Sequence, residues 1–337
     1  MADVITTIGA GKDYATPQTW HDAGYGGAGA GDDAVGNWFD SDVDTVLALS
    51  DVTPLSVTLQ SDASLGYDGT AGSGAGFNSS ANVANIGVVD IAAVGYAFQL
   101  YDFEIRRSKT VCDTAWMYGL SYGQDDDFVA ERLLIHHIIG STTATRFGTA
   151  LGLGGSRAIP TVKNCIAYLC GGGTGDVTGG NGFLINAAAA GKCYNNTAWN
   201  ILDVAGVGGD GIIQDADVVT RNCLAIDCDP DYSGTAHANN NYNADSDNTA
   251  PGANSVHNET SAVFVNTGAG TEDLRLSASA GNLVDAGIGP ASDAVVPTMD
   301  IDGTARAGTT CDIGADEYVG GAPSFAGSNL ILGGGVL

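Results

Sequence analysis

Three basic side chains are the strongest candidates for catalysis in this sequence. Lys163 and Arg221 occupy the same position in a repeated segment, two repeats apart, and Arg106 directly follows an earlier copy. A lysine or arginine can act as the base of a polysaccharide lyase when a cation or an acid neutralises the carboxylate of the substrate. An outward ladder of solvated charges explains the same pair without catalysis. The sequence therefore offers these three residues only as weak candidates.

Four aspartates form a candidate set for a bound cation. Asp229, Asp231, Asp245 and Asp247 lie in polar loops among asparagines and backbone carbonyls, and such oxygen ligands suit Ca²⁺. The sequence has no twelve-residue EF-hand loop, and we expect no other cofactor. With 39 acidic residues in the chain, carboxylate pairs at the spacing of a glycoside hydrolase arise by chance, so the run of aspartates at 125–127 is not evidence for one.

Two adjacent histidines, His136 and His137, lie in a predicted strand. Neighbouring side chains of a strand point to opposite faces, so we expect this pair to be poor co-ligands of a metal. The simpler expectation is that one of them is a buried, hydrogen-bonded histidine.

The elements that must position these residues repeat along the chain. A short apolar strand returns five times between about residues 95 and 229, and its last residues are 30, 32, 31 and 27 apart. These residues are Ile105, Ile135, Ala167, Ala198 and Ala225. Short strands separated by Gly, Asn and Asp turns, without amphipathic helices between them, must stack on their neighbours to bury their apolar faces. The pattern predicts an all-β, single-stranded, right-handed parallel β-helix in which these five residues form one column. A β-sandwich with chance periodicity is the alternative.

The composition limits the function. The chain has 337 residues, 50 of them Gly, and its formal net charge is −27. That charge opposes binding to nucleic acid or to anionic lipid, and no apolar run is long enough to span a membrane. The seven cysteines occur without a signal peptide at the first residues, and Cys165 and Cys223 share a position in the repeat. We expect buried thiols, and folding in a reducing cytoplasm.

We expect three parts along the chain. Residues 1–40 form an N-terminal cap and a Gly-rich loop, with Thr16 capping a short helix that begins at Pro17. Residues 41–318 form the β-helix, with a surface excursion at 66–82. Residues 319–337 form an apolar, Gly-rich tail that we expect to mediate assembly. Its apolar side chains near the C-terminus are Leu330, Ile331, Leu332, Val336 and Leu337.

Five segments before the tail resemble the closing part of pectate-lyase-like β-helix proteins of bacteria and phages, a group with an IDAG…DIDGxxR…DIGAxEY signature. They are VFVN at 263–266, DLRL at 273–276, VDAG at 284–287, DIDGTAR at 300–306 and DIGADEY at 312–318. Ala280 to Leu283 stands where the usual Ser-Pro precedes the IDAG part of the signature, here VDAG at 284–287. The resemblance implies a β-helix and carries over no catalytic residue. We expect Arg306 to pair with an acid of this region. Its candidate partners are Asp300, Asp302 and Asp312.

These observations favour a structural protein of a bacteriophage virion, a capsid decoration or cement protein that folds in the host cytoplasm. We expect its partners to be other copies of itself, with a trimer as the best guess, and a capsid or other virion protein. The first alternative is a β-helix protein that binds or cleaves polysaccharide, such as a tailspike or a lyase, for which a host surface glycan would be the partner. The second is a secreted bacterial surface adhesin.

Overall fold

The computed structural model describes the chain from residue 3 to residue 319 with internal gaps. The described residues are 3–29, 32–38, 43–44, 47–49, 56–61, 71, 75–78, 87–91, 97–106, 117–122, 127–139, 148–153, 159–172, 180–186, 190–202, 209–306 and 308–319. The predicted assembly tail lies outside them from residue 320 onward, including Leu330, Ile331, Leu332, Val336 and Leu337.

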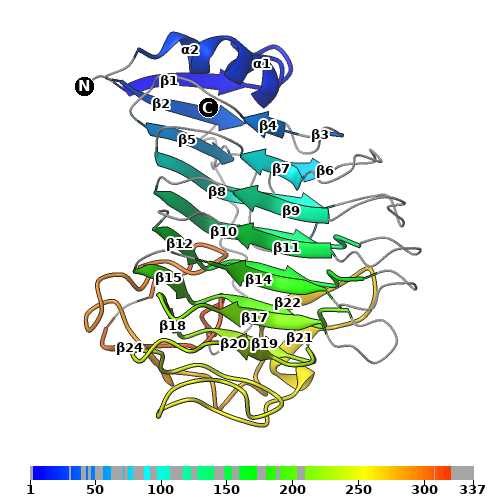
Figure 1. The fold of residues 1–337 in the computed structure, drawn as a ribbon, viewed down its shortest axis with the longest axis vertical. Helices are drawn as coiled ribbons and strands as arrows, with labels where there is room; N and C mark the ends of the chain where they lie inside the picture. The colour runs from blue at the N-terminus through cyan, green and yellow to red at the C-terminus, as the bar shows by residue number, and fades with distance from the viewer. Residues whose placement is uncertain are drawn as a thin grey trace, which may run out of the picture.

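The described chain forms a parallel β-helix, as predicted, in which strands stack as successive rungs (Figure 1). The first sheet contains a series of strands in which each is hydrogen-bonded to the next. In order, they are β1 (Asp3–Ile8), β2 (Asp33–Trp38), β5 (Ser56–Ser61), β8 (Ala97–Arg106), β10 (Phe128–His136), β12 (Pro160–Lys163), β15 (Gly191–Tyr194) and β18 (Val218–Arg221). The same sheet continues beside them through β3 (Val43–Asp44), β6 (Ala75–Asn78), β13 (Ile166–Tyr168), β16 (Thr197–Trp199) and β19 (Leu224–Ile226). The second sheet contains β4 (Leu47–Leu49), β7 (Gly87–Ile91), β9 (Met117–Tyr122), β11 (Gly148–Leu153), β14 (Asn181–Ile185), β17 (Asp210–Gln214) and β20 (Tyr232–Gly234).

The predicted column is confirmed by the strand register. Ile105 pairs with Ile135, Ile135 with Ala167, and the two following pairs extend through Ala198 to Ala225. All five side chains are buried between the sheets. The near-constant spacing in the sequence is therefore the length of one coil.

Each coil bends sharply just before this column. The residues at the bend have left-handed backbone conformations, with φ between 51° and 66°, and they are Asp102, Arg132, Asn164, Asn195 and Asn222. Asparagine and aspartate tolerate this conformation better than other side chains because they can hydrogen-bond locally. This bend explains why asparagine opens three of the repeated segments.

The first coil is covered by a helical cap, as predicted. Helix α1 (Pro17–Asp22) begins at the N-cap Thr16, whose side chain and that of Thr19 form a reciprocal capping box. α1 and the short α2 (Gly24–Gly27) bury Trp20 and Tyr25 above the open end of the sheet. No helix in the described part of the chain has the length and apolar character required to cross a bilayer.

The β-helix begins earlier than residue 41. β1 and β2 already pair in parallel register as its first rungs, because their alternating apolar residues face the same core as the later strands. The predicted surface excursion at 66–82 also contains a strand, β6, whose Phe77 is fully buried and pairs with Ile105. The high glycine content of residues 66–82 led to the prediction of a surface loop and gave no indication of the buried strand β6.

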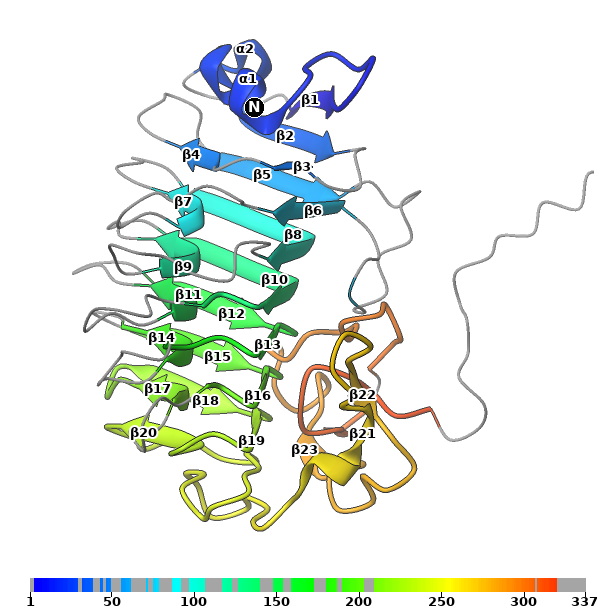
Figure 2. The same ribbon diagram turned by 90° about the vertical axis from the view of Figure 1, so that its right-hand side faces the viewer.

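The segment from 261 to 318 leaves the stack and folds back along its side, where we call it the C-terminal layer (Figure 2). It contains the 3-10 turn η2 (Ser261–Val263) and two antiparallel pairs, β21 (Phe264–Asn266) with β22 (Asp273–Leu276) and β23 (Gly287–Ile288) with β24 (Thr310–Cys311). The layer covers outward-facing apolar side chains of the lower coils. The contacting core includes Leu134, Ile166, Trp199, Leu224, Phe264, Leu274, Leu276, Leu283, Ile301 and Ile313. The predicted solenoid range of 41–318 therefore extends too far at this end.

Cys165, Cys170, Cys193 and Cys223 are buried inside the solenoid, and Cys311 is buried in the C-terminal layer. Cys165 and Cys223 are fully buried, as predicted, and burial raises the pKa of both thiols. Cys193 lies between their coils, with its Sγ 3.7 Å from the Sγ of Cys223. That distance is much longer than a disulfide bond of about 2.05 Å, so these two thiols are in contact and unbonded.

Candidate functional site

Lys163 and Arg221 lie in one column, with Tyr194 between them, as their shared place in the repeat implies. Lys163 Nζ is 2.9 Å from Glu131 Oε2 on the preceding coil. Arg221 Nη1 is 2.6 Å from Asp293 Oδ2 of the C-terminal layer, and its guanidinium lies 6.0 Å from the Tyr194 ring centroid. Both charged groups are engaged by carboxylates of their own chain, which fits a structural ladder better than a catalytic base.

Three of the four aspartates proposed for Ca²⁺, Asp231, Asp245 and Asp247, accept hydrogen bonds within the loops. Asp231 accepts from the backbone of Cys228 at 2.9 Å and of Ser246 at 2.6 Å, and its own N–H donates to Asp247. Burial raises the pKa of Asp231 to about 6. These contacts bring Asp231 and Asp247 together.

The two remaining members of that set have other roles. Asp245 accepts from the backbone of Ala250 and lies 2.9 Å from His257 Nδ1. Asp229 precedes a cis proline, and its backbone N–H donates to the carbonyl of Gly209. Ca²⁺ binding by the four residues stays a prediction.

A different acidic group has the spacing of metal ligands. Within the described residues, Asp300, Asp302 and Asp316 place one carboxylate oxygen each within 4.8 Å of one another. Burial, together with the neighbouring Asp302, raises the pKa of Asp300 to about 9. Burial likewise raises the pKa of Asp316 to about 7. These three residues could hold a divalent cation, although their oxygens also accept backbone N–H groups of Thr304 and Leu276.

Arg306 makes a different ion pair from the predicted one. Its Nη1 donates to Glu317 Oε2 at 2.8 Å, and its guanidinium also donates to the carbonyls of Asp312 and Gly314. The predicted pairing with the carboxylate of Asp300, Asp302 or Asp312 is therefore wrong. The carboxylates of Asp300 and Asp312 instead accept the backbone N–H groups of Glu317 and Tyr318, which face them across the turn.

The third candidate base, Arg106, lies in a pocket between the first sheet and the C-terminal layer. We call it the histidine pocket. Its lining residues are Ala71, Asn78, Arg106, His136, His137, Tyr168, Gly270 and Glu272, and its volume is about 380 Å³. Four of them form an outward column, because Asn78 pairs with Arg106, Arg106 with His136, and His136 with Tyr168. Gly270 and Glu272 reach the pocket from the turn between β21 and β22.

The two histidines lie on the same side of the sheet, so the prediction of opposite faces is wrong. His137 has a left-handed φ of 56°, which ends the strand and turns its ring back toward its neighbour. The two Nδ1 atoms are 2.7 Å apart. The prediction of one buried, hydrogen-bonded histidine is confirmed, since His136 is 4% exposed and its Nε2 lies 2.7 Å from Glu104 Oε1.

Glu104, His136 and His137 therefore form a continuous chain of hydrogen bonds. Arg106 Nη1 lies 3.6 Å from the same Glu104 oxygen, and the His136 ring stacks on Tyr168 at 4.8 Å between centroids and 1° between planes. Burial and the neighbouring His136 lower the pKa of His137. Burial, with Glu272 and Glu104, raises the pKa of Tyr168. Such a chain can hold a proton at a fixed nitrogen, as acid–base sites and polar binding sites require.

Sequence reasoning missed most of this pocket. Glu104 and Tyr168 are ordinary members of the repeat, and Asn78 lies in the Gly-rich stretch. Glu104 and Tyr168 lie two coils apart, and the strand register brings them close together. The repeat length could have indicated that register. Glu272 comes from the returning layer, for whose position the sequence carries no signal.

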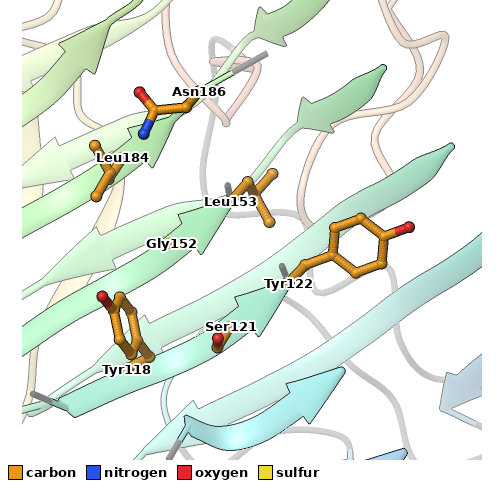
Figure 3. Close-up of a pocket in the computed structure, with 7 residues that line it drawn as sticks. All are labelled: Tyr118, Ser121, Tyr122, Gly152, Leu153, Leu184 and Asn186. Carbon is orange, nitrogen blue, oxygen red and sulfur yellow. The ribbon is translucent and has the colours of Figure 1, made fainter. Parts of the chain in front are cut away.

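A second hollow, of about 250 Å³, lies on the outer face of the second sheet (Figure 3). Tyr118, Ser121, Leu184 and Asn186 point into it from β9, β14 and the residue that follows β14. The Tyr118 ring lies over Gly152, where a Cβ would come within 2.5 Å of the ring. The hollow contains hydrogen-bonding groups but no chain of titratable residues like that of the histidine pocket.

Comparison with known proteins gives no assignment. No family model matches this chain, and no curated protein matches it. The resemblance to pectate-lyase-like proteins therefore stays a prediction from the sequence.

Proposed function

We propose that the protein is a structural component of a bacteriophage virion, a capsid decoration protein whose β-helix is displayed on the head. The observation that carries this proposal is that elements of the described body cover its own open end and its apolar side. The helical cap covers the first coil, and the C-terminal layer covers the apolar side of the lower coils. The large apolar side chains exposed on the described body are scattered. They are Ile5, Ile159, Val265, Met299 and Val319.

A body of this kind suits display. Each coil is hydrogen-bonded to the next in parallel register, and its basic side chains Lys163 and Arg221 join neighbouring segments in ion pairs. Stacked coils stabilise one another through nearest-neighbour interfaces, so the rod needs no partner to remain folded. The net charge of −27 keeps such a body soluble and discourages contact with nucleic acid.

We assign attachment to the tail, residues 319–337. Burying its five apolar side chains near the C-terminus would contribute about 1.5 to 3 kcal/mol each, before the cost of ordering the chain at about 1 to 2 kcal/mol per residue. A single copy would therefore bind weakly. Symmetry-related copies that engage together would bind much more tightly, which is why we propose a cyclic homo-oligomer, with a trimer as the best guess.

The test removes residues 328–337 and measures co-sedimentation with phage particles, with circular dichroism as the check on folding. We expect the truncated protein to remain folded and to stay in the supernatant. The matched control is Val265→Ser, which removes an exposed apolar side chain from the body and should co-sediment normally. Wild-type co-sedimentation of the truncated chain would refute the assignment, and loss of the β-sheet signal would show that the tail belongs to the core.

A further inference from the structure

The histidine pocket contains two buried polar atoms without a hydrogen-bond partner in the described part of the chain. They are the hydroxyl of Tyr168, a residue that is 1% exposed, and Oδ1 of Asn78. Buried polar groups in native proteins are nearly always satisfied by protein, water or ligand, because an unsatisfied one costs about 1 to 3 kcal/mol. The cavity of about 380 Å³ is roughly ten times the volume that one water occupies in the liquid and falls in the range of small-molecule sites.

The hydrogen-bond chain limits the donor and acceptor roles of the His137 ring nitrogens. An ionised Glu104 only accepts, so His136 Nε2 donates to it. The 2.7 Å contact between the two Nδ1 atoms holds one proton, so one Nδ1 donates and the other accepts. When His137 Nδ1 is the donor, the neutral ring carries a lone pair on Nε2 and can accept from a ligand hydroxyl. The lowered pKa of His137 keeps this neutral form at neutral pH.

The charges around the cavity decide the class of ligand. One guanidinium, Arg106, stands beside two carboxylates, Glu104 and Glu272, and Glu104 is already engaged by His136 and Arg106. One guanidinium beside two carboxylates gives the pocket no excess of positive charge, and the whole chain carries −27. An anionic ligand such as a uronate would enter against this field.

We propose that the histidine pocket binds one uncharged, hydroxyl-rich unit, such as a neutral sugar residue or a polyol. Ligand hydroxyls donate to His137 Nε2 and Asn78 Oδ1, and another accepts from the Tyr168 hydroxyl. Glu272 accepts from a further hydroxyl with the carboxylate oxygen that Gly270 does not engage. This binding role goes beyond the proposed structural role and does not depend on it, since the pocket and the tail are separate parts of the chain.

The test is isothermal titration of the full chain at neutral pH against three probes of one size: glucose, glucuronate and glucosamine. We expect glucose to bind with a dissociation constant of the order of 1 mM and glucuronate to bind at least 10-fold more weakly. Glucosamine distinguishes a preference for uncharged ligands from a preference for cations. Tighter binding of glucuronate or glucosamine than of glucose would overturn the assignment, as would the absence of binding by all three.

Tyr168→Phe is the decisive variant, because it removes only the hydroxyl and leaves the ring stacked on His136. We expect glucose binding to weaken about 2- to 10-fold, while the unliganded protein unfolds at the same or a higher temperature than wild type. The matched control is Tyr118→Phe, in the hollow of the second sheet, which should leave glucose binding unchanged. A lower unfolding temperature of Tyr168→Phe without ligand, together with unchanged glucose affinity, would show that the hydroxyl serves the fold. Co-sedimentation with particles should be unaffected, so a failure here is distinguishable from a failure of the attachment proposal.

Discussion

Replacing Arg306 with alanine should loosen the last turns of the C-terminal layer, because its guanidinium bonds to groups within residues 312–317. The side chain is fully buried, with 0% exposure. Its guanidinium holds Glu317 at 2.8 Å and two backbone carbonyls, those of Asp312 and Gly314, at 3.2 and 3.0 Å. Breaking a buried ion pair by removing one partner costs about 3 to 5 kcal/mol, because the other charge remains without compensation. We expect a loss of this size in the local stability of these turns.

The matched control is Arg275→Ala. Arg275 pairs with Asp273 at 2.6 Å, but the two residues lie in one strand and their side chains keep some contact with solvent. A pair this close in sequence can also form in the unfolded chain, so its loss should cost only about 0 to 1 kcal/mol. The difference between the two variants isolates the contribution of the buried tertiary contact.

Hydrogen exchange followed by mass spectrometry is the appropriate assay, because the layer can open while the coils remain folded. The informative amides are those of Ile313 and Gly314, which bond to the carbonyls of Leu283 and Asn222 at 3.1 and 2.8 Å. In Arg306→Ala they should exchange at least about 100-fold faster, since each 1.4 kcal/mol is a factor of ten. Peptides from β5, whose buried apolar residues belong to the core inside the solenoid and not to that of the layer, should be unchanged. The reasoning fails if both variants exchange alike at these two amides.

Three further predictions concern the acids, the core and the thiols. Because the pKa of Asp316 is raised to about 7 and that of Asp300 to about 9, the folded state holds protons that the unfolded state releases above about pH 4, so the layer should lose stability as the pH rises from 4 to 9. Asp316→Asn should flatten this dependence in urea unfolding followed at several pH values, and an unchanged slope would contradict the assignment. Ile135→Ala should destabilise the solenoid by about 2 to 5 kcal/mol in the same assay, because it opens a cavity between two coils; a loss below 1 kcal/mol would argue against close packing there. Cys165 should react with a thiol reagent only when the protein unfolds, because the side chain is fully buried and its raised pKa disfavours the thiolate; rapid labelling of the native protein would refute this.

The repeat was readable from the sequence because a parallel β-helix is organised by local length. Each coil must return to the same place above the last, so the column from Ile105 to Ala225 appears in the sequence as a spacing near 30 residues. The asparagines at the bends and the Thr16 cap were readable for a similar reason. The left-handed backbone of a bend by itself favours asparagine, and the Thr16 cap forms with a residue three positions away.

The histidine pocket required the tertiary structure. His137 has a left-handed backbone conformation, so its side chain lies on the same face as that of His136 and not on the opposite face, where a neighbour in a strand is expected. The repeat pattern in the sequence gives no indication of this turn. The pocket also needs the C-terminal layer, which returns over more than a hundred residues to place Glu272 beside Tyr168.

The sequence by itself determined the coil length, the inward column, the capped first coil and the charge that opposes nucleic acid. These properties depend on composition and on contacts at one fixed sequence separation. The tertiary structure alone decided the partner of Arg306, the limits of the solenoid and the meeting of Glu104, His136 and Tyr168 in one cavity. Those features depend on how the last segment packs against outward side chains of several coils, and that packing is settled by burial of apolar area, which has no fixed spacing in the sequence.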